Sequence, residues 1–272
     1  MHLSGLLTEI LGFLHLGRGQ PAPLRIAGHP PSIRRPLSPI SPPAALHFWP
    51  QLCCDTGRIA SIRAVPPSRL QGDTGGVLRL SLDQVRAWRM QGLRPPEIAI
   101  PLSLRAVESA EEARLLLWEI DRQETDAGRL IFCAPSSNGR SIKYAGLSLL
   151  AQSGCGIELD CLCPDLMARM QDHRPGLSRM RIAPAFVQGC HRNPHRGQLA
   201  LSLLALAERH GLSSIAEGIA TREEHGFLAQ LGCDIIQGEA VAPLLDGDGT
   251  AHFLHATSRP QPRMNLPTRP AA

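Results

Sequence analysis

Short apolar runs alternate with longer amphipathic stretches from about residue 46 to residue 237. Runs of four to nine residues rich in apolar side chains favour strands, and apolar residues at spacings of three and four favour helices. The pattern predicts strands over 46–54, 58–65, 98–101, 130–134, 156–160, 180–183, 213–216 and 234–237. It predicts helices over 81–90, 109–124, 141–152, 198–210 and 223–231. Strands and helices therefore follow one another along most of the chain.

Local signals mark where several of these elements begin. Asp55-Thr56-Gly57, between the first two strands, is typical of a hairpin turn. Three pairs have the spacing of a capping box, which marks a helix start: Ser81 with Gln84, Ser109 with Glu112, and Thr221 with Glu224. An opening antiparallel hairpin followed by repeated strand–helix units predicts an α/β fold, closed as a TIM-like (β/α) barrel. Such barrels carry their chemistry at the carboxyl ends of the strands.

The two ends of the chain differ from the part between them. In residues 1–45, apolar side chains from Leu3 to Leu14 recur at helical spacing, and a proline-dense arm follows. This predicts a short amphipathic helix plus a disordered arm, and leaves open whether the helix docks on its own chain or on another. Residues 46–245 form the predicted domain. Residues 246–272 are again rich in proline and are predicted to be a disordered tail.

Composition sets limits on location and partners. The net charge of +4 is too small to indicate a nucleic-acid partner, and Lys143 is the only lysine among 28 basic residues. No apolar run reaches the roughly 18 residues of a transmembrane helix, and residues 1–16 lack the features of a signal peptide. The eight cysteines have no disulfide framework. Cytoplasmic location with reduced thiols is the prediction, and metal binding by Cys155, Cys161 and Cys163 is disfavoured because no CxxC pair is present.

The most informative motif lies near the end of the domain. Ile215-Ala216-Glu217-Gly218-Ile219 reads as a strand that ends on a carboxylate and a glycine, and Leu231-Gly232-Cys233-Asp234-Ile235-Ile236-Gln237-Gly238 follows a capped helix. The chain resembles the EAL family, bacterial domains that hydrolyse or sense cyclic di-GMP. The resemblance covers roughly residues 46–245 and includes Phe48, Pro50 and Asp55-Thr56-Gly57-Arg58. It implies a barrel whose intact members hold two Mg²⁺ or Mn²⁺ ions with carboxylate and amide oxygens.

Most of the family's metal-binding positions carry different chemistry in this chain. The Glu-Ala-Leu motif falls on Arg63-Ala64-Val65, and the family's lysine falls on Arg181. Three further polar positions of the family fall on Pro101, Ser136 and Ala220. The remnants of the catalytic set are Asp160, Glu217 and Gln237. The resemblance also implies a shortened domain near the first helix, because 66–80 is a Gly-Pro-rich stretch where the family places a loop and a helix.

These replacements favour a domain that has no intact catalytic site, no metal site and no cofactor. The leading hypothesis is a catalytically inactive EAL-like domain that acts as a regulatory or protein-interaction module in cyclic di-GMP signalling. One alternative is metal-independent binding of cyclic di-GMP through Arg63, Arg181 and Gln237. Another is residual phosphodiesterase activity with one metal on Asp160 and Glu217. A protein partner is expected, and cyclic di-GMP binding and a homodimer stay open.

Two sets of basic residues can each be interpreted in two ways. Arg63 and Arg181 can pair with a ligand phosphate, or they can pair inside the barrel with Asp160 or Glu217, which is the favoured interpretation. The cluster His191, Arg192, His195 and Arg196 lies before a predicted helix. It could hold an anion, but a solvated loop is favoured, and a zinc site with Cys190 is disfavoured by the spacing.

Overall fold

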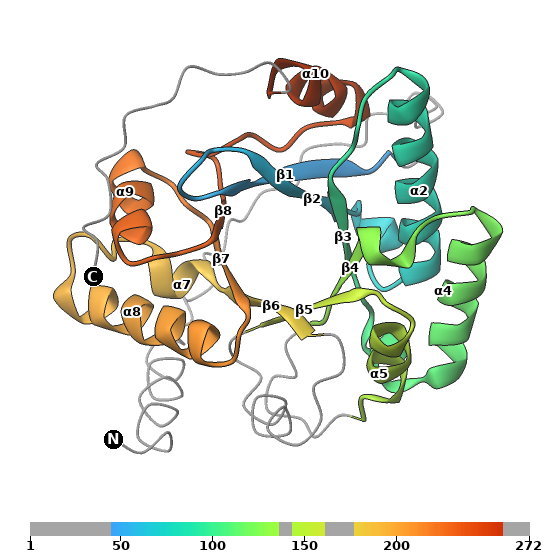
Figure 1. The fold of residues 1–272 in the computed structure, drawn as a ribbon, viewed down its shortest axis with the longest axis horizontal. Coiled ribbons are helices and arrows are strands. Elements are labelled where there is room, and N and C mark those ends of the chain that lie inside the picture. The colour runs from blue at the N-terminus through green and yellow to red at the C-terminus, as the bar shows by residue number, and fades with distance from the viewer. Residues whose placement is uncertain (1–44, 136–142, 161–176, 258–272) are drawn as a thin grey trace, which may run out of the picture. The chain divides into compact units, whose positions relative to one another are not determined.

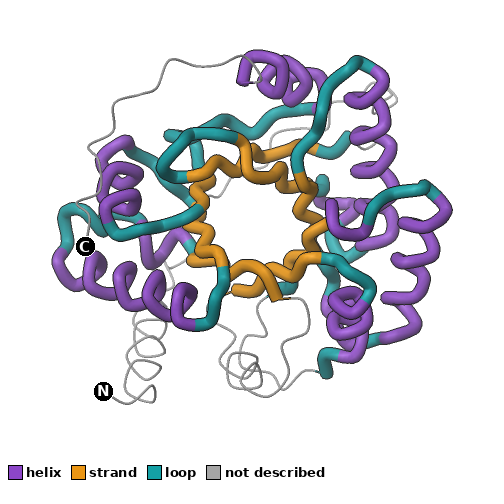
Figure 2. Tube along the Cα trace, in the orientation of Figure 1, coloured by secondary structure: helices purple, strands orange, loops and turns teal. Residues whose placement is uncertain are grey.

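The computed structural model describes residues 45–135, 143–160 and 177–257. Eight strands close into a barrel in chain order (Figures 1 and 2). β1 (His47–Cys53) and β2 (Ile59–Val65) form the predicted antiparallel hairpin. The other strands are β3 (Glu97–Pro101), β4 (Leu130–Cys133), β5 (Gly156–Asp160), β6 (Leu177–Ile182), β7 (Ser213–Glu217) and β8 (Ile235–Gln237). β2 to β8 run parallel, and β8 pairs with β1 in the antiparallel direction. The predicted α/β barrel is confirmed.

Helices cover the outside of this barrel (Figure 2). The α-helices are α2 (Thr74–Met90), α3 (Leu104–Glu108), α4 (Ala110–Arg122), α5 (Ala145–Gln152), α7 (Pro184–Val187), α8 (Pro194–Arg209), α9 (Arg222–Gln230) and α10 (Gly247–Thr257). Two 3₁₀ turns are η1 (Ser68–Leu70) and η2 (Ala127–Arg129). Within the described residues, no helix is both long and apolar enough to cross a membrane.

The apolar core lies between the barrel and its helices. Trp88 of α2 and Phe48 of β1 are almost fully buried, and their rings meet edge to face with centroids 5.0 Å apart. The indole N–H of Trp88 donates to the carbonyl of Gly247 at 2.9 Å, which ties α2 to the start of α10. Phe132 of β4 and Phe186 of α7 are equally buried. The strands are thus held from outside by packing, and their inward side chains are free for a polar site.

The predicted starts of two helices are wrong: α8 begins at Pro194 rather than at 198, and the start of α2 is further off. α2 begins at Thr74 rather than at Ser81, and Asp73 caps it by accepting a hydrogen bond from Gly76 N at 2.9 Å. Ser81 is buried inside the helix, where its hydroxyl donates to the carbonyl of Val77 at 2.7 Å. The Gly-Pro-rich stretch 66–80, where a shortened domain was predicted, therefore contains η1 and the first two turns of the 17-residue helix α2.

The prediction for the tail is also wrong in part. Gly247–Thr257 forms α10, and Thr250, Ala251 and Leu254 of this helix are buried. Asp246 starts the helix by accepting from Gly249 N at 2.7 Å. The predicted N-terminal helix and proline-rich arm lie outside the described residues, as does the remainder of the tail from residue 258.

Candidate functional site inside the barrel

Polar contacts cross the inside of the barrel between strands that are not neighbours in the sheet. Arg63 of β2 reaches Glu217 of β7 and Glu158 of β5. Arg179 of β6 reaches Ser61 of β2. Successive residues of a strand point to opposite faces, so these side chains share the inner face with others two positions away. The interior is therefore polar over much of its depth.

A charge cluster of five side chains, Arg63, Glu158, Asp160, Arg181 and Glu217, occupies the carboxyl end of the barrel. Arg63 Nη1 donates to Glu217 Oε1 and lies 3.4 Å from Glu158 Oε1. Arg181 Nη1 lies 3.7 Å from Glu158 Oε1 and 3.9 Å from Glu217 Oε1, and its Nη2 lies 3.6 Å from Asp160 Oδ2. The Glu158 side chain has no exposed surface, and the other four are at most 18% exposed. Each guanidinium is thus shared among carboxylates.

The protonation of the cluster follows from this geometry. Burial by itself lowers the pKa of the Arg63 guanidinium, but nearby anionic groups raise it above its ordinary value: Cys133 when ionised, then Glu217, Glu158 and Asp160. Burial, and then the charge of Glu158, raises the pKa of the Cys133 thiol. Cys133 is therefore a neutral thiol at neutral pH, and the carboxylates are the groups that hold the Arg63 cation.

A second set of five residues, the amide network, joins Gln51, Ser61, Glu97, Arg179 and Gln237. Gln51 Nε2 donates to Gln237 Oε1 at 2.8 Å, and the Ser61 hydroxyl donates to Gln51 Oε1. Arg179 donates to Ser61 Oγ at 2.6 Å and to Glu97 Oε2 at 2.6 Å. The side-chain oxygen of Gln237 is therefore already bonded inside the protein.

The structure brings together four of the five residues singled out from the sequence. Arg63, Arg181, Asp160 and Glu217 meet in the charge cluster. Gln237 joins the amide network instead. Of the three further positions where the family's polar residues are replaced, Pro101 and Ala220 are described, whereas Ser136 lies outside the described residues. Cys161 and Cys163, for which metal binding was disfavoured, also lie outside them.

Sequence reasoning missed Glu158, Arg179 and Gln51. Glu158 stands two positions before Asp160, and Arg179 stands two positions before Arg181. Side chains two positions apart in a strand point to the same face, so Glu158 lies on the face of Asp160, and Arg179 lies on the face of Arg181. A charged residue two positions before a predicted site residue is therefore also expected inside the barrel. That signal was present in the sequence.

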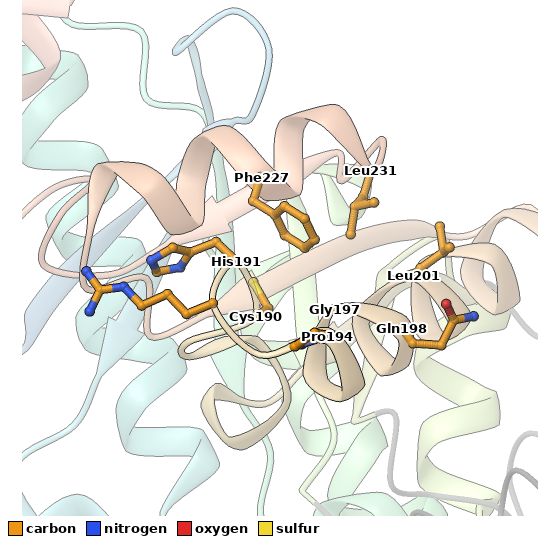
Figure 3. A pocket seen from close by; sticks show the side chains of 9 residues that line it. Cys190, His191, Pro194, Gly197, Gln198, Leu201, Phe227 and Leu231 are labelled. Carbon is orange, nitrogen blue, oxygen red and sulfur yellow. The ribbon is translucent and has the colours of Figure 1, made fainter.

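The basic cluster around His191 borders a separate pocket of about 290 Å³ between α8 and α9 (Figure 3). Phe227, Leu201 and Leu231 line much of it, and His191 lies at one end (Figure 3). Asn193 caps α8 by accepting from the backbone N–H groups of His195 and Arg196 at 3.0 and 3.2 Å. The donors that an anion would use at this helix start are therefore occupied.

Comparison with known proteins identifies the family. The family model of the EAL domain matches residues 74–243, which is more than half of the chain. The chain belongs to the EAL domain family. It is 25% identical over 217 residues to the bifunctional diguanylate cyclase/cyclic di-GMP phosphodiesterase MucR of Pseudomonas aeruginosa, a match that covers 71% of this chain and 32% of MucR. The chain spans about a third or less of the length of the curated relatives that it matches first.

Solved structures of EAL domains share the fold. The EAL domain of Mycobacterium smegmatis DcpA has a TM-score of 0.71 and 20% identity, and the match covers 79% of this chain and 99% of that domain. The PaMucR phosphodiesterase in its c-di-GMP complex has a TM-score of 0.61 and 22% identity, with 74% of this chain and 91% of that chain covered. At these identities the likeness establishes the barrel and not its chemistry.

The residues present do not fit the pair of divalent ions that an intact EAL site implies. The sequence resemblance predicts a metal-binding glutamate at the position of Arg63, and the Arg63 guanidinium forms an ion pair with the Glu217 carboxylate. Among the described residues, no three His, Cys, Asp or Glu side chains are grouped as a metal site. Hard cations such as Mg²⁺ require several free oxygen ligands, and in this EAL domain the candidate oxygens face cations.

Proposed function

We propose that this EAL domain does not hydrolyse cyclic di-GMP and works as a regulatory or protein-interaction module in cyclic di-GMP signalling. The observation that carries the proposal is the ion pair between Arg63 and Glu217, with Glu158 beside it. A guanidinium at the position of a metal-binding glutamate both removes an oxygen ligand and adds a positive charge.

The electrostatics support loss of the metals. Three carboxylates and two guanidinium groups leave the charge cluster with one net negative charge. Two divalent cations would add four positive charges to this site. Two unit charges about 4 Å apart repel by about 4 kcal/mol at an effective dielectric near 20, and a dication doubles that value. The five residues already form ion pairs with one another without metal, although Glu158 Oε2 has no hydrogen-bond partner within the described residues.

Direct binding of cyclic di-GMP by arginine is the alternative that the contacts support less. Arg63 and Arg181 are each within 4.0 Å of two or more carboxylate groups. A phosphate would have to displace these partners and leave Glu158, which has no exposed surface, without its cations. Solved relatives that hold c-di-GMP, such as the PaMucR complex, make this ligand the one to test.

The proposal includes a cytoplasmic location. The six cysteines within the described residues are all free thiols. Free thiols are typical of reducing compartments, whereas secreted domains pair their cysteines.

A hydrolysis assay tests the proposal on the full chain. The substrate is cyclic di-GMP with Mn²⁺ or Mg²⁺, and the expected result is no turnover above the rate without protein. Arg63→Glu alone is expected to stay inactive, because the amide oxygen expected at position 101 is also absent. Metal-dependent turnover that disappears in Glu217→Ala would overturn the proposal and favour residual phosphodiesterase activity.

Calorimetry in EDTA separates the interaction module from a metal-independent effector. Titration of cyclic di-GMP into the wild-type chain is expected to give no heat of binding. Binding that is lost in Arg63→Glu but retained in Arg58→Glu would favour the effector. Arg58 is the matched control because it lies on the same hairpin with its side chain exposed.

A further inference from the structure

Two cysteines meet where the barrel closes. The last strand, β8, completes the barrel by pairing in the antiparallel direction with β1. Directly after β1, the backbone N–H of Cys54 donates to the carbonyl of Asp234 at 2.8 Å. Cys233 precedes Asp234 in the chain. The end of β1 and the start of β8 therefore each bring a cysteine to this seam of the barrel.

The two thiols are buried and contact each other. Cys54 has no exposed surface, Cys233 is 2% exposed, and neither is in a disulfide. A side-chain hydrogen bond joins them. The Cys233 thiol donates its own proton to the carbonyl of Ile235 at 3.3 Å, so the Cys54 thiol is the donor within the pair. The sulfur atoms of a disulfide are about 2.05 Å apart, and a hydrogen-bonded pair of thiols needs only a small movement to reach that distance.

Helix α9 holds both cysteines in place. The Nε2–H group of His225 in α9 donates to the carbonyl of Cys54 at 2.9 Å. The backbone N–H of Cys233 donates to the carbonyl of Leu228 at 3.0 Å, at the end of the same helix. In Figure 1, α9 lies beside β8 and the turn of the β1–β2 hairpin. The two thiols are thus kept together by the helix and the strands around them.

The surroundings make Cys233 the more reactive of the two thiols. The hydrogen bond from Cys54, and then that from Ser214, lowers the pKa of Cys233 in spite of its burial. The bond to Cys233, and then burial, raises the pKa of Cys54. Burial raises the pKa of Cys155, another buried thiol, to about 11. Because the thiolate is the reactive form, Cys233 reacts first, and Cys54 is the thiol beside it.

We propose that Cys54 and Cys233 form a redox modification site, at which a peroxide converts the two thiols into a disulfide across the closing seam of the barrel. The Cys233 thiolate attacks one oxygen of hydrogen peroxide, the O–O bond breaks, and the released hydroxide takes up a proton to become water. Cys233 is then a sulfenic acid.

The second step forms the disulfide. The Cys54 sulfur attacks the Cys233 sulfur, the S–O bond breaks, and the leaving hydroxide takes the Cys54 proton to become a second water molecule. Each sulfur has then lost one electron, and the peroxide has gained two. A dithiol reductant reverses the change by thiol–disulfide exchange and is itself oxidised to a disulfide.

The disulfide would fix the closure of the barrel. It links the end of the first strand to the start of the last one, so it encloses most of the domain in a covalent ring. Such a ring restricts the unfolded chain and stabilises the folded one. Neither cysteine belongs to the charge cluster, so the pair can be oxidised whether or not the domain hydrolyses cyclic di-GMP.

Peptide mapping of the full chain tests the proposal. The reduced protein, freed of reductant, is treated with hydrogen peroxide, alkylated under denaturing conditions and analysed by mass spectrometry. The expected product is a peptide pair joined through Cys54 and Cys233, and dithiothreitol is expected to restore both thiols. The midpoint of thermal unfolding is expected to rise by about 10 °C on oxidation, because the ring is large.

Cys54→Ala separates the two steps. Without the second thiol, peroxide is expected to leave Cys233 as a sulfenic acid, which dimedone traps, and the midpoint is expected not to rise. Cys53→Ala is the matched control, because successive residues of an extended chain point to opposite faces. It is expected to keep the disulfide and the full rise. Circular dichroism checks the fold of each variant, and Cys233→Ala, which should form neither product, serves if Cys54→Ala does not fold.

Three results would overturn the proposal. One is a disulfide between Cys233 and Cys190, which is the buried thiol whose charge also acts on Cys233. Another is a rise of the thermal midpoint that persists in Cys54→Ala. The third is a wild-type chain in which both thiols are still alkylated after treatment with millimolar peroxide.

Discussion

The guanidinium of Arg63 in β2 donates a hydrogen bond to the carboxylate of Glu217 in β7, across the inside of the barrel and 154 positions along the chain. The sequence resemblance predicts a glutamate of the EAL family at the positions of both Arg63 and Glu217. Two glutamates at these positions could share a bound metal ion. In this chain the positive charge beside Glu217 comes instead from the Arg63 guanidinium. The ion pair therefore links β2 to β7 across the barrel and supports the proposal that this site holds no metal.

Arg63→Met is expected to destabilise the domain. It leaves Glu217 with one guanidinium at 3.9 Å and Glu158 with one at 3.7 Å. Breaking a buried ion pair from one side costs about 3 kcal/mol or more, and partial exposure of Arg63 brings the expected loss to about 2–3 kcal/mol. Urea unfolding at neutral pH measures the loss, with the exposed Arg58→Met as the control.

The double variant Arg63→Met/Glu217→Gln makes this prediction sharper. Removing both charged partners is expected to cost less than removing Arg63 alone, because the charge at position 217 that loses its main partner is then also absent. The double variant is thus expected to be more stable than Arg63→Met alone. If the double variant loses as much free energy of unfolding as the two single variants together, Arg63 and Glu217 are not coupled.

The favoured sequence interpretation, that Arg63 and Arg181 pair inside the barrel with Asp160 or Glu217, is confirmed, whereas the contacts of Glu158 were not predicted. Arg63, Asp160, Arg181 and Glu217 end strands or stand in family motifs, so their positions were recognisable. Which of them pair depends on barrel closure and strand register, and these are set by packing over the whole domain. Glu158 was missed because it lies inside an apolar strand, although its period-2 relation to Asp160 was visible.

Local sequence signals also failed to locate the starts of some helices. Gly75 and Gly76 follow Asp73 and have poor helix propensity, so the sequence favoured Ser81 as the start of α2. Buried contacts of Val77 and Leu78 extend the helix to Thr74. In α10, burial of Ala251 and Leu254 similarly outweighs a glycine-rich start. Tertiary packing decided both cases against local propensity.

Substitutions at two of the predicted capping boxes test where α9 and α2 begin. Thr221 and Glu224 form the box at the start of α9, with Thr221 Oγ1 accepting from Glu224 N at 3.2 Å. Thr221→Ala is expected to lower the free energy of unfolding by about 1 kcal/mol. Ser81→Ala, at the position that proved to be inside α2, is expected to change it by less than about 0.5 kcal/mol. Urea unfolding compares them, and equal effects would contradict the observed helix starts.

The pH dependence of stability is expected to show a contribution from Glu119. Hydrogen bonds from Arg122, and then from Gln123, lower the pKa of this carboxyl below its usual value of 4.5. A lowered pKa means that the native carboxylate adds stability above the usual value and loses it as the pH falls through the native pKa. The stability difference between wild type and Glu119→Gln should therefore be largest near neutral pH and shrink below pH 4.5.

Glu208→Gln on α8 is the control for that titration, because Glu208 is exposed. Unfolding in urea at a series of pH values provides both curves. A difference for Glu119→Gln that grows as the pH falls would contradict the sign of the pKa shift.

The close contact between α5 and α3 can be tested with one added methyl group. A Cβ at Gly146 of α5 would lie 2.0 Å from the carbonyl oxygen of Ala106 and 2.6 Å from that of Ser109, so the helices would have to separate. Gly146→Ala is expected to lower the free energy of unfolding by about 3 kcal/mol, at the upper end for overpacking, because the backbone oxygens that the Cβ meets cannot rotate away. The matched change is Gly226→Ala in α9, where a Cβ would meet nothing within 4 Å. It is expected to stabilise the domain by about 0.5–1 kcal/mol through helix propensity. Thermal and urea unfolding should thus give effects of opposite sign, and two stabilising substitutions would show that α5 does not lie against α3 as described.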